Sequence, residues 1–202
     1  WTDSRSIGEA AALREQADGL ILEQSFHRID TIWTLPQLAW VKANEPEVWE
    51  KVRRIFFAKD YLRWRLTGEF ATDLIEAQGS MLFDCRKNVW SPELCGLIGL
   101  DVGLLPPLLR PSDFAGKVTV RAAEELGLRA GTPVVCGTTD TAMEILASGS
   151  IREGQMTVKL ATAGRICVIT SRAWPSRHLV NYSHVKEGLW YPGTATKSAA
   201  AS

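Results

Sequence analysis

The stretch GTPVVCGTTDTAMEILASGSIREGQMTVKLATAGRICVIT, residues 131–170, decides the fold of this chain. A short apolar run at 133–136 leads through Gly137 and two threonines to Asp140, and apolar residues then recur at helical spacing until Gly149. The pattern predicts a buried strand, a tight turn and a helix. In open α/β sheets the ligand lies beyond the carboxyl ends of the strands, so we expect Asp140 at the mouth of a cleft.

Alternating apolar residues flank a small polar segment downstream of this helix. Residues 156–161 and 166–170 have the alternation of two strands, and the sequence Thr-Ala-Gly-Arg at 162–165 lies between them. The pattern predicts a β-hairpin with a glycine in its tip. A second, weaker hairpin is predicted over residues 181–191.

These features together resemble the junction between the two domains of the FGGY carbohydrate kinases, most closely the xylulose kinases. The shared features are the acid after strand and turn, the helix, the Arg-Glu-Gly-Gln sequence at 152–155 and the hairpin with a Thr-x-Gly tip. Two motifs depart from the family. Residues 138–141 are Thr-Thr-Asp-Thr in place of Gly-Gly-Asp-Asn, and residues 161–164 are Ala-Thr-Ala-Gly in place of Gly-Thr-Ser-Gly.

The resemblance extends upstream. Residues 31–44, TIWTLPQLAWVKAN, resemble the first signature of the family, and the run at 56–84 resembles the family almost position by position. The resemblance places Trp33 near the sugar cleft. Trp40 is interpreted as a core residue, because large aromatic side chains dominate core burial. The Trp-x-Asp-x-Arg sequence at 1–5 resembles the stretch that follows the first phosphate loop of complete family members.

The resemblance implies an α/β fold, the actin-like, ribonuclease H-like fold of two-domain sugar kinases, of which this chain covers only part. Residues 1–150 would form the C-terminal part of the first, sugar-binding domain, and residues 151–202 the start of the second, nucleotide-binding domain. The chain begins at Trp1 without an initiating Met and stops at Ser202, so both ends look cut. We expect the chain alone to be inactive, because it lacks the first phosphate loop and the adenine segment.

The implied activity is ATP-dependent phosphorylation of a sugar hydroxyl, with a ketopentose such as xylulose as substrate and Mg²⁺ carried by the nucleotide. Asp140 matches the family's base, an ionised carboxylate that accepts the hydroxyl proton. The residue pattern alone fits an N-cap for a helix at 141–148 equally well. A non-catalytic relative that binds a sugar or a nucleotide is the alternative, because the departures fall within the motifs.

The resemblance implies two groups of site residues. Those that would contact the sugar are Asp140, Thr141 and Trp33. Those that would contact the nucleotide phosphates, through backbone N–H groups, a hydroxyl and a guanidinium, are Thr162, Gly164 and Arg165. An exposed arginine without a phosphate role fits the last position equally well.

The composition narrows the class of protein. The 202 residues include 23 basic and 23 acidic side chains, so there is no excess of positive charge to favour binding to nucleic acid or an anionic membrane. A hydrophobic fraction of 46% is ordinary for a globular protein. No apolar run approaches the ~20 residues of a membrane span, and no signal-peptide pattern opens the chain. We expect a cytoplasmic protein whose partners are a small-molecule sugar and ATP, and the full-length protein could form a homodimer.

Cysteine and charged residues receive structural interpretations. The 4 cysteines lack C-x-x-C spacing and are predicted to be free thiols, and the 3 histidines lack ligand spacing, so no protein-bound metal is expected. The aspartates interpreted as helix caps and turn formers are Asp60, Asp73 and Asp84. The cations interpreted as a solvated helix face are Lys59, Arg63 and Arg65. A short buried strand is expected at 55–58.

Overall fold

Short helices and short strands alternate along the chain in the computed structural model, which describes residues 3–160 and 164–196. The helices are α1 (Ile7–Ser25), α2 (Thr34–Asn44), α3 (Pro46–Trp49), α4 (Ala58–Thr67), α5 (Leu74–Gln78), α6 (Pro92–Gly96), α7 (Val120–Leu126) and α8 (Asp140–Ala147), with a 3-10 turn η1 at Val102–Leu104. The strands are β1 (Thr72–Asp73), β2 (Phe83–Asp84), β3 (Val89–Trp90), β4 (Leu108–Leu109), β5 (Phe114–Lys117), β6 (Pro133–Val135), β7 (Met156–Leu160), β8 (Gly164–Val168) and β9 (Gly193–Thr196).

The strands of the described residues pair in small separate sheets. β1 and β4 are parallel, whereas β2 pairs with β3, and β5 with β6, in antiparallel order. β8 is the central strand of an antiparallel sheet with the order β7-β8-β9, in which Gly164 lies opposite both Leu160 and Thr196. The predicted hairpin at 156–170 is therefore present as β7 and β8.

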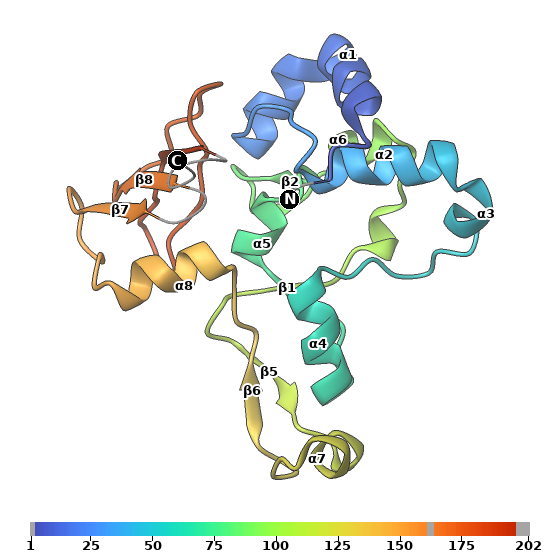
Figure 1. Cartoon of the computed structure of the whole chain (residues 1–202), viewed down its shortest axis with the longest axis vertical. Coiled ribbons are helices and arrows are strands. Elements are labelled where there is room, and N and C mark those ends of the chain that lie inside the picture. Colours follow the sequence, from blue (N-terminus) through green and yellow to red (C-terminus); the bar gives the residue numbers. More distant parts are fainter. Residues whose placement is uncertain (1–2, 161–163, 197–202) are drawn as a thin grey trace.

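The elements separate into three regions (Figure 1). Helices α1, α2 and α6 lie together at the top, the β5–β6 ribbon with α7 extends to the bottom, and α8 lies beside β7 and β8. The core of the first region includes Leu13, Ile21 and Leu35. A second cluster of buried residues joins Ile75 of α5 to Ile145 of α8. This second cluster attaches the C-terminal strands to the first region.

Helix boundaries follow local sequence signals. α4 ends at Gly68, whose backbone is left-handed (φ 79°) as predicted for a C-terminal glycine. Ser91 caps α6 by accepting a hydrogen bond from the Leu94 N–H, and Pro92 occupies the first turn. α2 stops at Asn44 and α3 starts at Pro46, which confirms the predicted stop and start.

Two strand predictions are wrong. The β6 strand is not buried, since Val135 is 58% exposed; β6 pairs only with β5, so the two-stranded ribbon leaves much of its surface open. Residues 55–58 form no strand, because Ile55 makes a single backbone hydrogen bond to Leu104 and its neighbours find no ladder partner. By contrast, the hairpin predicted over 181–191 is present in short form: an antiparallel bridge joins Ser183 and Trp190, and backbone hydrogen bonds run from the Tyr191 N–H to the Tyr182 carbonyl and from the His184 N–H to the Leu189 carbonyl.

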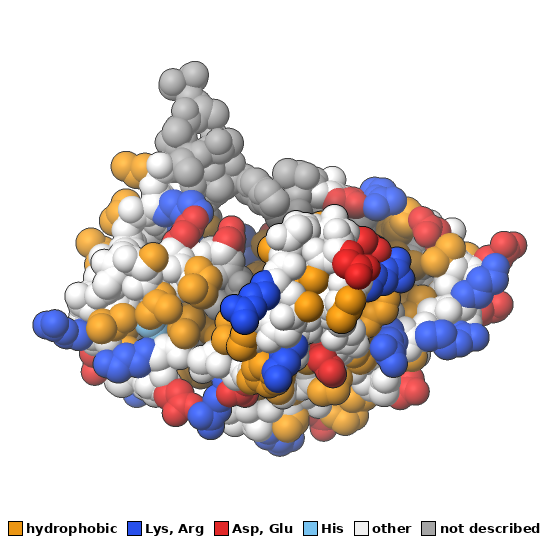
Figure 2. Space-filling model, turned by 90° about the horizontal axis from the view of Figure 1, so that it is seen from below, with side chains coloured by type: hydrophobic (Ala, Val, Ile, Leu, Met, Phe, Trp, Pro, Cys, Tyr) orange, Lys and Arg blue, Asp and Glu red, His pale blue; other side chains and the backbone are white. Residues whose placement is uncertain are grey.

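The surface and the thiols agree with an evenly charged globular chain. Basic and acidic side chains are interspersed over the face seen in Figure 2, with hydrophobic side chains between them. All 4 cysteines are free and buried, which confirms the thiol prediction. In the part of the chain that the structure describes, no helix has both the length and the apolar character needed to cross a bilayer.

Candidate active site

A cleft with a volume of about 1190 Å³ is lined by the loop before α2, the first turn of α8 and the strands β8 and β9. The predicted site residues that line it are Trp33, Asp140, Thr141, Gly164 and Arg165. Thr162, the remaining predicted residue, lies outside the described residues. Residues more than one hundred positions apart in the sequence thus meet around one cleft, as the resemblance implied.

Asp140 is the first residue of α8 and follows the turn after β6. Thr139 is the N-cap, and its hydroxyl accepts a hydrogen bond from the Ala142 N–H at 3.4 Å. The N-cap interpretation of Asp140 is therefore wrong. Its Oδ1 accepts hydrogen bonds from the Thr141 N–H (2.6 Å) and the Thr141 hydroxyl (3.3 Å), while its Oδ2 receives none from the described residues. The side chain is exposed at the helix N-terminus, where the helix dipole favours negative charge.

Trp33 forms a rigid part of the cleft wall. Its side chain is 7% exposed, stacks on the His27 ring with centroids 4.6 Å apart, and donates a hydrogen bond from Nε1 to the Arg28 carbonyl at 2.9 Å. Burial to this extent leaves Trp33 little surface for a sugar. Trp40 is only partly buried, with the Arg5 guanidinium 4.3 Å from its ring centroid, so it lies at the edge of the core.

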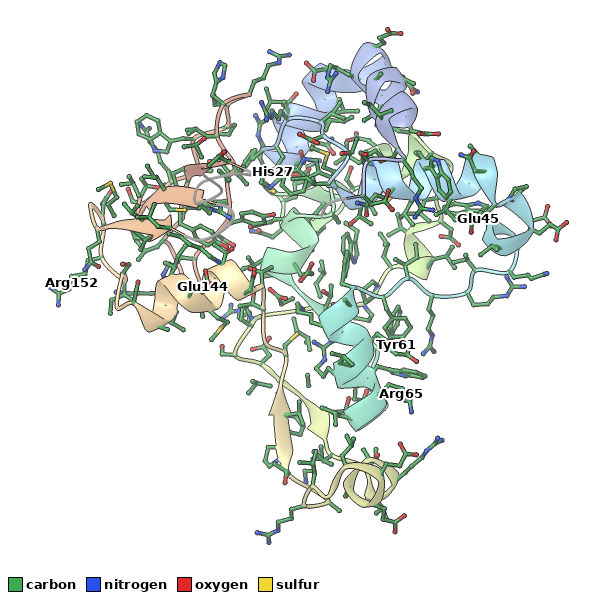
Figure 3. The ribbon with its side chains drawn as sticks, viewed as in Figure 1. His27, Glu45, Tyr61, Arg65, Glu144 and Arg152 are labelled. Atoms are coloured by element: carbon green, nitrogen blue, oxygen red, sulfur yellow. The ribbon has the colours of Figure 1, made fainter. Side chains whose placement is uncertain are left out.

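His27 lines the cleft and was not predicted as a site residue. Its ring lies between Trp33 and Tyr182, at 4.6 and 4.9 Å between centroids, and its Nδ1 faces the Asn181 N–H at 3.5 Å. Burial and the charge of Arg165 lower the pKa of His27 to about 3, so the imidazole is neutral. Figure 3 places His27 where the C-terminal strands meet the rest of the chain. A lone histidine in a loop carries no sequence signal for this position.

Arg165 lies on β8 opposite Lys159 of β7, and it lines the cleft. Nε donates to the Cys167 thiol at 3.0 Å, and the guanidinium carbon lies 5.4 Å from the Tyr191 ring centroid and 5.6 Å from that of Tyr182. Nη2 is buried and has no hydrogen-bond partner among the described residues. Because an unpaired buried N–H group is costly, this donor suits an anionic ligand.

Other cations line the cleft, and each has a carboxylate partner. The pairs are Arg28 with Asp30 (4.0 Å), Lys159 with Glu144 (2.7 Å) and Arg177 with Asp18. No such ion pair is found for Arg165 within the described ranges. Its charge is therefore the one that no carboxylate of the described residues neutralises.

A buried ionic cluster lies behind the turn that carries Asp140. Lys59 Nζ lies 2.7 Å from Asp60 Oδ1 and 2.8 Å from Asp73 Oδ2, and both carboxylates are 0% exposed. Arg63, 5% exposed, donates to Asp60 at 2.8 Å and to the Cys136 carbonyl at 2.8 Å. The interpretation of Lys59 and Arg63 as a solvated face is therefore wrong, because this side of α4 packs against the end of β6.

The remaining charged residues of this run behave as the sequence predicts, with one exception. Asp73 caps α5 by accepting from the Ile75 and Glu76 N–H groups, and Asp84 accepts from two N–H groups of its turn. Arg65 is exposed and lies on the outer side of α4 together with Tyr61 (Figure 3). Asp60 is not a cap; it lies inside the first turn of α4 and is consumed by the ion pairs.

Comparison with known proteins gives a consistent result. The family model described as the N-terminal domain of the FGGY family of carbohydrate kinases matches residues 1–147. A xylulose kinase from Bacillus subtilis is 30% identical over 82% of this chain and 33% of its own length. A xylulose kinase from Streptomyces rubiginosus is 33% identical over 97% of this chain and 41% of its own length. The chain thus spans about two fifths or less of these relatives.

The fold comparison agrees. The crystal structure of a xylulose kinase from Brucella ovis superimposes with a TM-score of 0.91 and 30% identity over 99% of this chain, which is 41% of that protein. The expected α/β sugar-kinase fold is confirmed by this similarity, and the resemblance seen in the motifs around Asp140 is confirmed by the family match. The chain belongs to the FGGY family of carbohydrate kinases.

Proposed function

We propose that the full-length protein containing this chain transfers the γ-phosphoryl group of ATP to a sugar hydroxyl, with a ketopentose such as xylulose as substrate and Asp140 as general base. The observation that carries the proposal is that two groups line one cleft: the Asp140 carboxylate, whose Oδ2 accepts no hydrogen bond from the described residues, and the Arg165 guanidinium, whose buried Nη2 has no partner among them. The relatives named xylulose kinase supply the sugar class.

The chemistry asks little covalent work of the protein. The sugar hydroxyl oxygen attacks the γ-phosphorus, the bond from phosphorus to the ADP oxygen breaks, and the hydroxyl proton passes to Asp140. The exposed carboxylate at the start of α8 can meet the sugar, whereas Trp33 and Thr141 border the same space and limit its shape. Thr141 also fixes Oδ1 by two hydrogen bonds, which leaves Oδ2 for the proton.

The nucleotide phosphates would lie over β8. Arg165 lines the cleft there with a guanidinium that has no carboxylate partner among the described residues, and Gly164 beside it keeps the backbone free of a side chain; Thr162 is assigned to the same loop by sequence alone. Residues 3–160 and 164–196 contain no cluster of three His, Cys, Asp or Glu side chains that could hold a metal ion. Mg²⁺ is accordingly assigned to the nucleotide, where it neutralises phosphate charge when bound.

The domain assignment is part of the same proposal. Residues 1–150 would belong to the sugar-binding domain and residues 151–202 to the beginning of the nucleotide-binding domain, with the cleft between them. The match to the N-terminal domain of the family, which ends at residue 147, supports the boundary. In the same way α8, which carries Asp140, would be the last element of the first domain.

The test is a coupled ADP-release assay on the full-length protein with ATP, Mg²⁺ and a panel of pentuloses, together with the Asp140→Asn variant. We expect sugar-dependent ADP release that falls by about 10² to 10⁴-fold in the variant, while sugar affinity changes little because the amide keeps the shape of the carboxylate. Glu124→Gln, at an exposed carboxylate of α7 that makes no ion pair within the described residues, is the matched control. Sugar binding without ADP release in the wild type would favour the non-catalytic relative instead.

A further inference from the structure

The threonines that stand where the FGGY motif has glycines make hydrogen bonds that glycine could not make. The Thr138 hydroxyl donates to Asp73 Oδ1 at 2.7 Å, across 65 positions of sequence. Thr139 caps α8 through its own hydroxyl. These bonds lie on the two residues that immediately precede Asp140.

Asp73 is itself firmly held. Its Oδ1 also accepts from the Ile75 N–H at 2.9 Å and the Glu76 N–H at 3.2 Å, and its Oδ2 lies 2.8 Å from Lys59 Nζ. The carboxylate is 0% exposed, so these bonds form in a region of low dielectric where each is worth more than at the surface. Thr138 is thus bonded to a fixed point at the junction of α4 and α5.

We call the series Thr138, Asp73 and Lys59, joined by a hydrogen bond and an ion pair, the turn clamp. The backbone of the turn is fixed from the other side as well, because the Gly137 N–H donates to the Pro111 carbonyl at 2.9 Å. The Thr138 hydroxyl bond lies two residues before Asp140 and joins the turn to a segment outside α8, whereas the Thr139 hydroxyl bonds within the helix start. Loss of the Thr138 hydroxyl would leave the backbone contact in place and loosen the side that leads into α8.

Resting on the proposed kinase function, we propose that the turn clamp is a positioning device for Asp140. In-line phosphoryl transfer requires the base within hydrogen-bond reach of the attacking hydroxyl, and displacement by about 1 Å can cost about 10²-fold in rate. The hydroxyls at 138 and 139 then supply side-chain hydrogen bonds to this turn, whereas glycines at these positions would have none and would leave the backbone freer. The motif departures are, on this view, compatible with catalysis.

The test uses the full-length protein, two substitutions at position 138 and one control substitution at position 132. Thr138→Val keeps the shape and loses the hydroxyl, whereas Thr138→Ser retains a hydroxyl. Thr132→Val is the control: it removes an exposed hydroxyl that donates to the Arg129 carbonyl in the loop before β6. A hydrogen bond to a charged group is worth about 1.5–3 kcal/mol, so Thr138→Val should lower kcat by about 10- to 150-fold. The KM for the sugar should change by less than about threefold, because the clamp touches no substrate.

A second readout does not depend on catalysis. The Thr141 N–H donates to Asp140 Oδ1 at 2.6 Å, so its hydrogen exchange reports whether the carboxylate is held in place. We expect exchange at this amide to be at least tenfold faster in Thr138→Val than in the wild type, and unchanged in Thr138→Ser and Thr132→Val.

The two readouts separate the two proposals. Unchanged kcat and unchanged Thr141 exchange in Thr138→Val would overturn the turn clamp, as would an equal loss in Thr138→Ser. Suppose that the wild-type protein shows no sugar-dependent ADP release, while Thr141 exchange is faster in Thr138→Val than in the wild type. This result would overturn the kinase proposal and leave the turn clamp standing. Lower kcat with unchanged exchange would also contradict the clamp, since the effect would then not pass through the position of Asp140.

Discussion

Replacing Arg63 with methionine removes a guanidinium that is 5% exposed and joins three parts of the chain. Its Nη1 donates to Asp60 Oδ1 and to the Cys136 carbonyl, both at 2.8 Å, and its Nη2 donates to the Ala71 carbonyl. Methionine keeps the apolar stem, so the change tests the charged head and not the packing of the stem.

The size of the loss follows from what remains after the substitution. Asp60 stays 0% exposed and keeps Lys59 at 2.7 Å, so it is not left wholly unpaired, but two buried carbonyls lose their donor. Breaking a buried ion pair costs about 3–5 kcal/mol, and an unsatisfied buried acceptor about 1–3 kcal/mol. We expect about 3–5 kcal/mol in total, because Lys59 offsets part of the charge penalty.

Native-state hydrogen exchange of the α4 amides in the full-length protein measures this loss locally, which avoids assuming two-state unfolding of a larger protein. Arg65→Met is the matched control, since Arg65 is 48% exposed and its nearest carboxylate oxygen lies 3.8 Å away; it should change the opening free energy by less than about 0.5 kcal/mol. The double variant Asp60→Asn/Arg63→Met should lose less than Arg63→Met alone, because it also removes the buried Asp60 charge, which in the single variant keeps Lys59 as its only cationic partner among the described residues. Equal effects of Arg63→Met and Arg65→Met would refute the reasoning.

Three further outcomes are expected. Arg165→Met should raise the KM for ATP by about 10- to 150-fold in the full-length protein, which corresponds to the free energy of one hydrogen bond to a charged group. Arg152→Met, at an exposed arginine, is the control. An unchanged KM for ATP in Arg165→Met would remove Arg165 from the phosphate site. The pKa of His27 is about 3 in the folded chain, against an ordinary value of 6.5. As the pH falls below about 6.5 the imidazole therefore binds a proton in the unfolded chain but not in the folded chain, and the folded state loses stability. In thermal melts, His27→Gln should lose less stability than the wild type between pH 6.5 and 4. Burial raises the pKa of Glu76 from 4.5 to about 7, despite the opposing charge of Lys59. The folded chain therefore holds the carboxyl proton more tightly than the unfolded chain, and stability falls as the pH rises from 4.5 to 7. Glu76→Gln should remove that fall, and the same dependence of stability on pH in the variant would contradict the assignment.

The parts of the fold that the sequence predicts are those set by neighbours along the chain. Gly68 ends α4, Ser91 starts α6, and apolar spacing after Asp140 gives α8, because each depends on a backbone preference or a bond a few residues away. Asp140 could be selected for the same reason: a strand, a turn and a helix place an acid at an edge where ligands bind. Moving the N-cap by one residue, from Asp140 to Thr139, is a boundary error within this local picture.

The errors concern residues whose partners are far away in sequence. Arg63 was interpreted as solvated because a run of charged residues on a helix is usually a solvated face, yet its partner at Cys136 is 73 positions away. His27 and Asn181 meet across 154 positions, and Thr138 and Asp73 across 65. A pattern of residues along the sequence contains no information about such distant contacts. The positions where charge is buried or a ring is held between two others are therefore the ones that only the fold reveals.

This division has a consequence for the site itself. The acid that would do the chemistry was found from local pattern, whereas the groups that fix it in place, Asp73 and Lys59, come from segments that pattern reads as caps and surface. The threonines of residues 138–141 looked like departures from a catalytic motif until the bond from Thr138 to Asp73 was seen. A comparison of residue identities alone would count these threonines against catalysis. Their hydrogen bonds instead support Asp140 as the proposed base, because proton transfer from a sugar hydroxyl requires a carboxylate that is held in place.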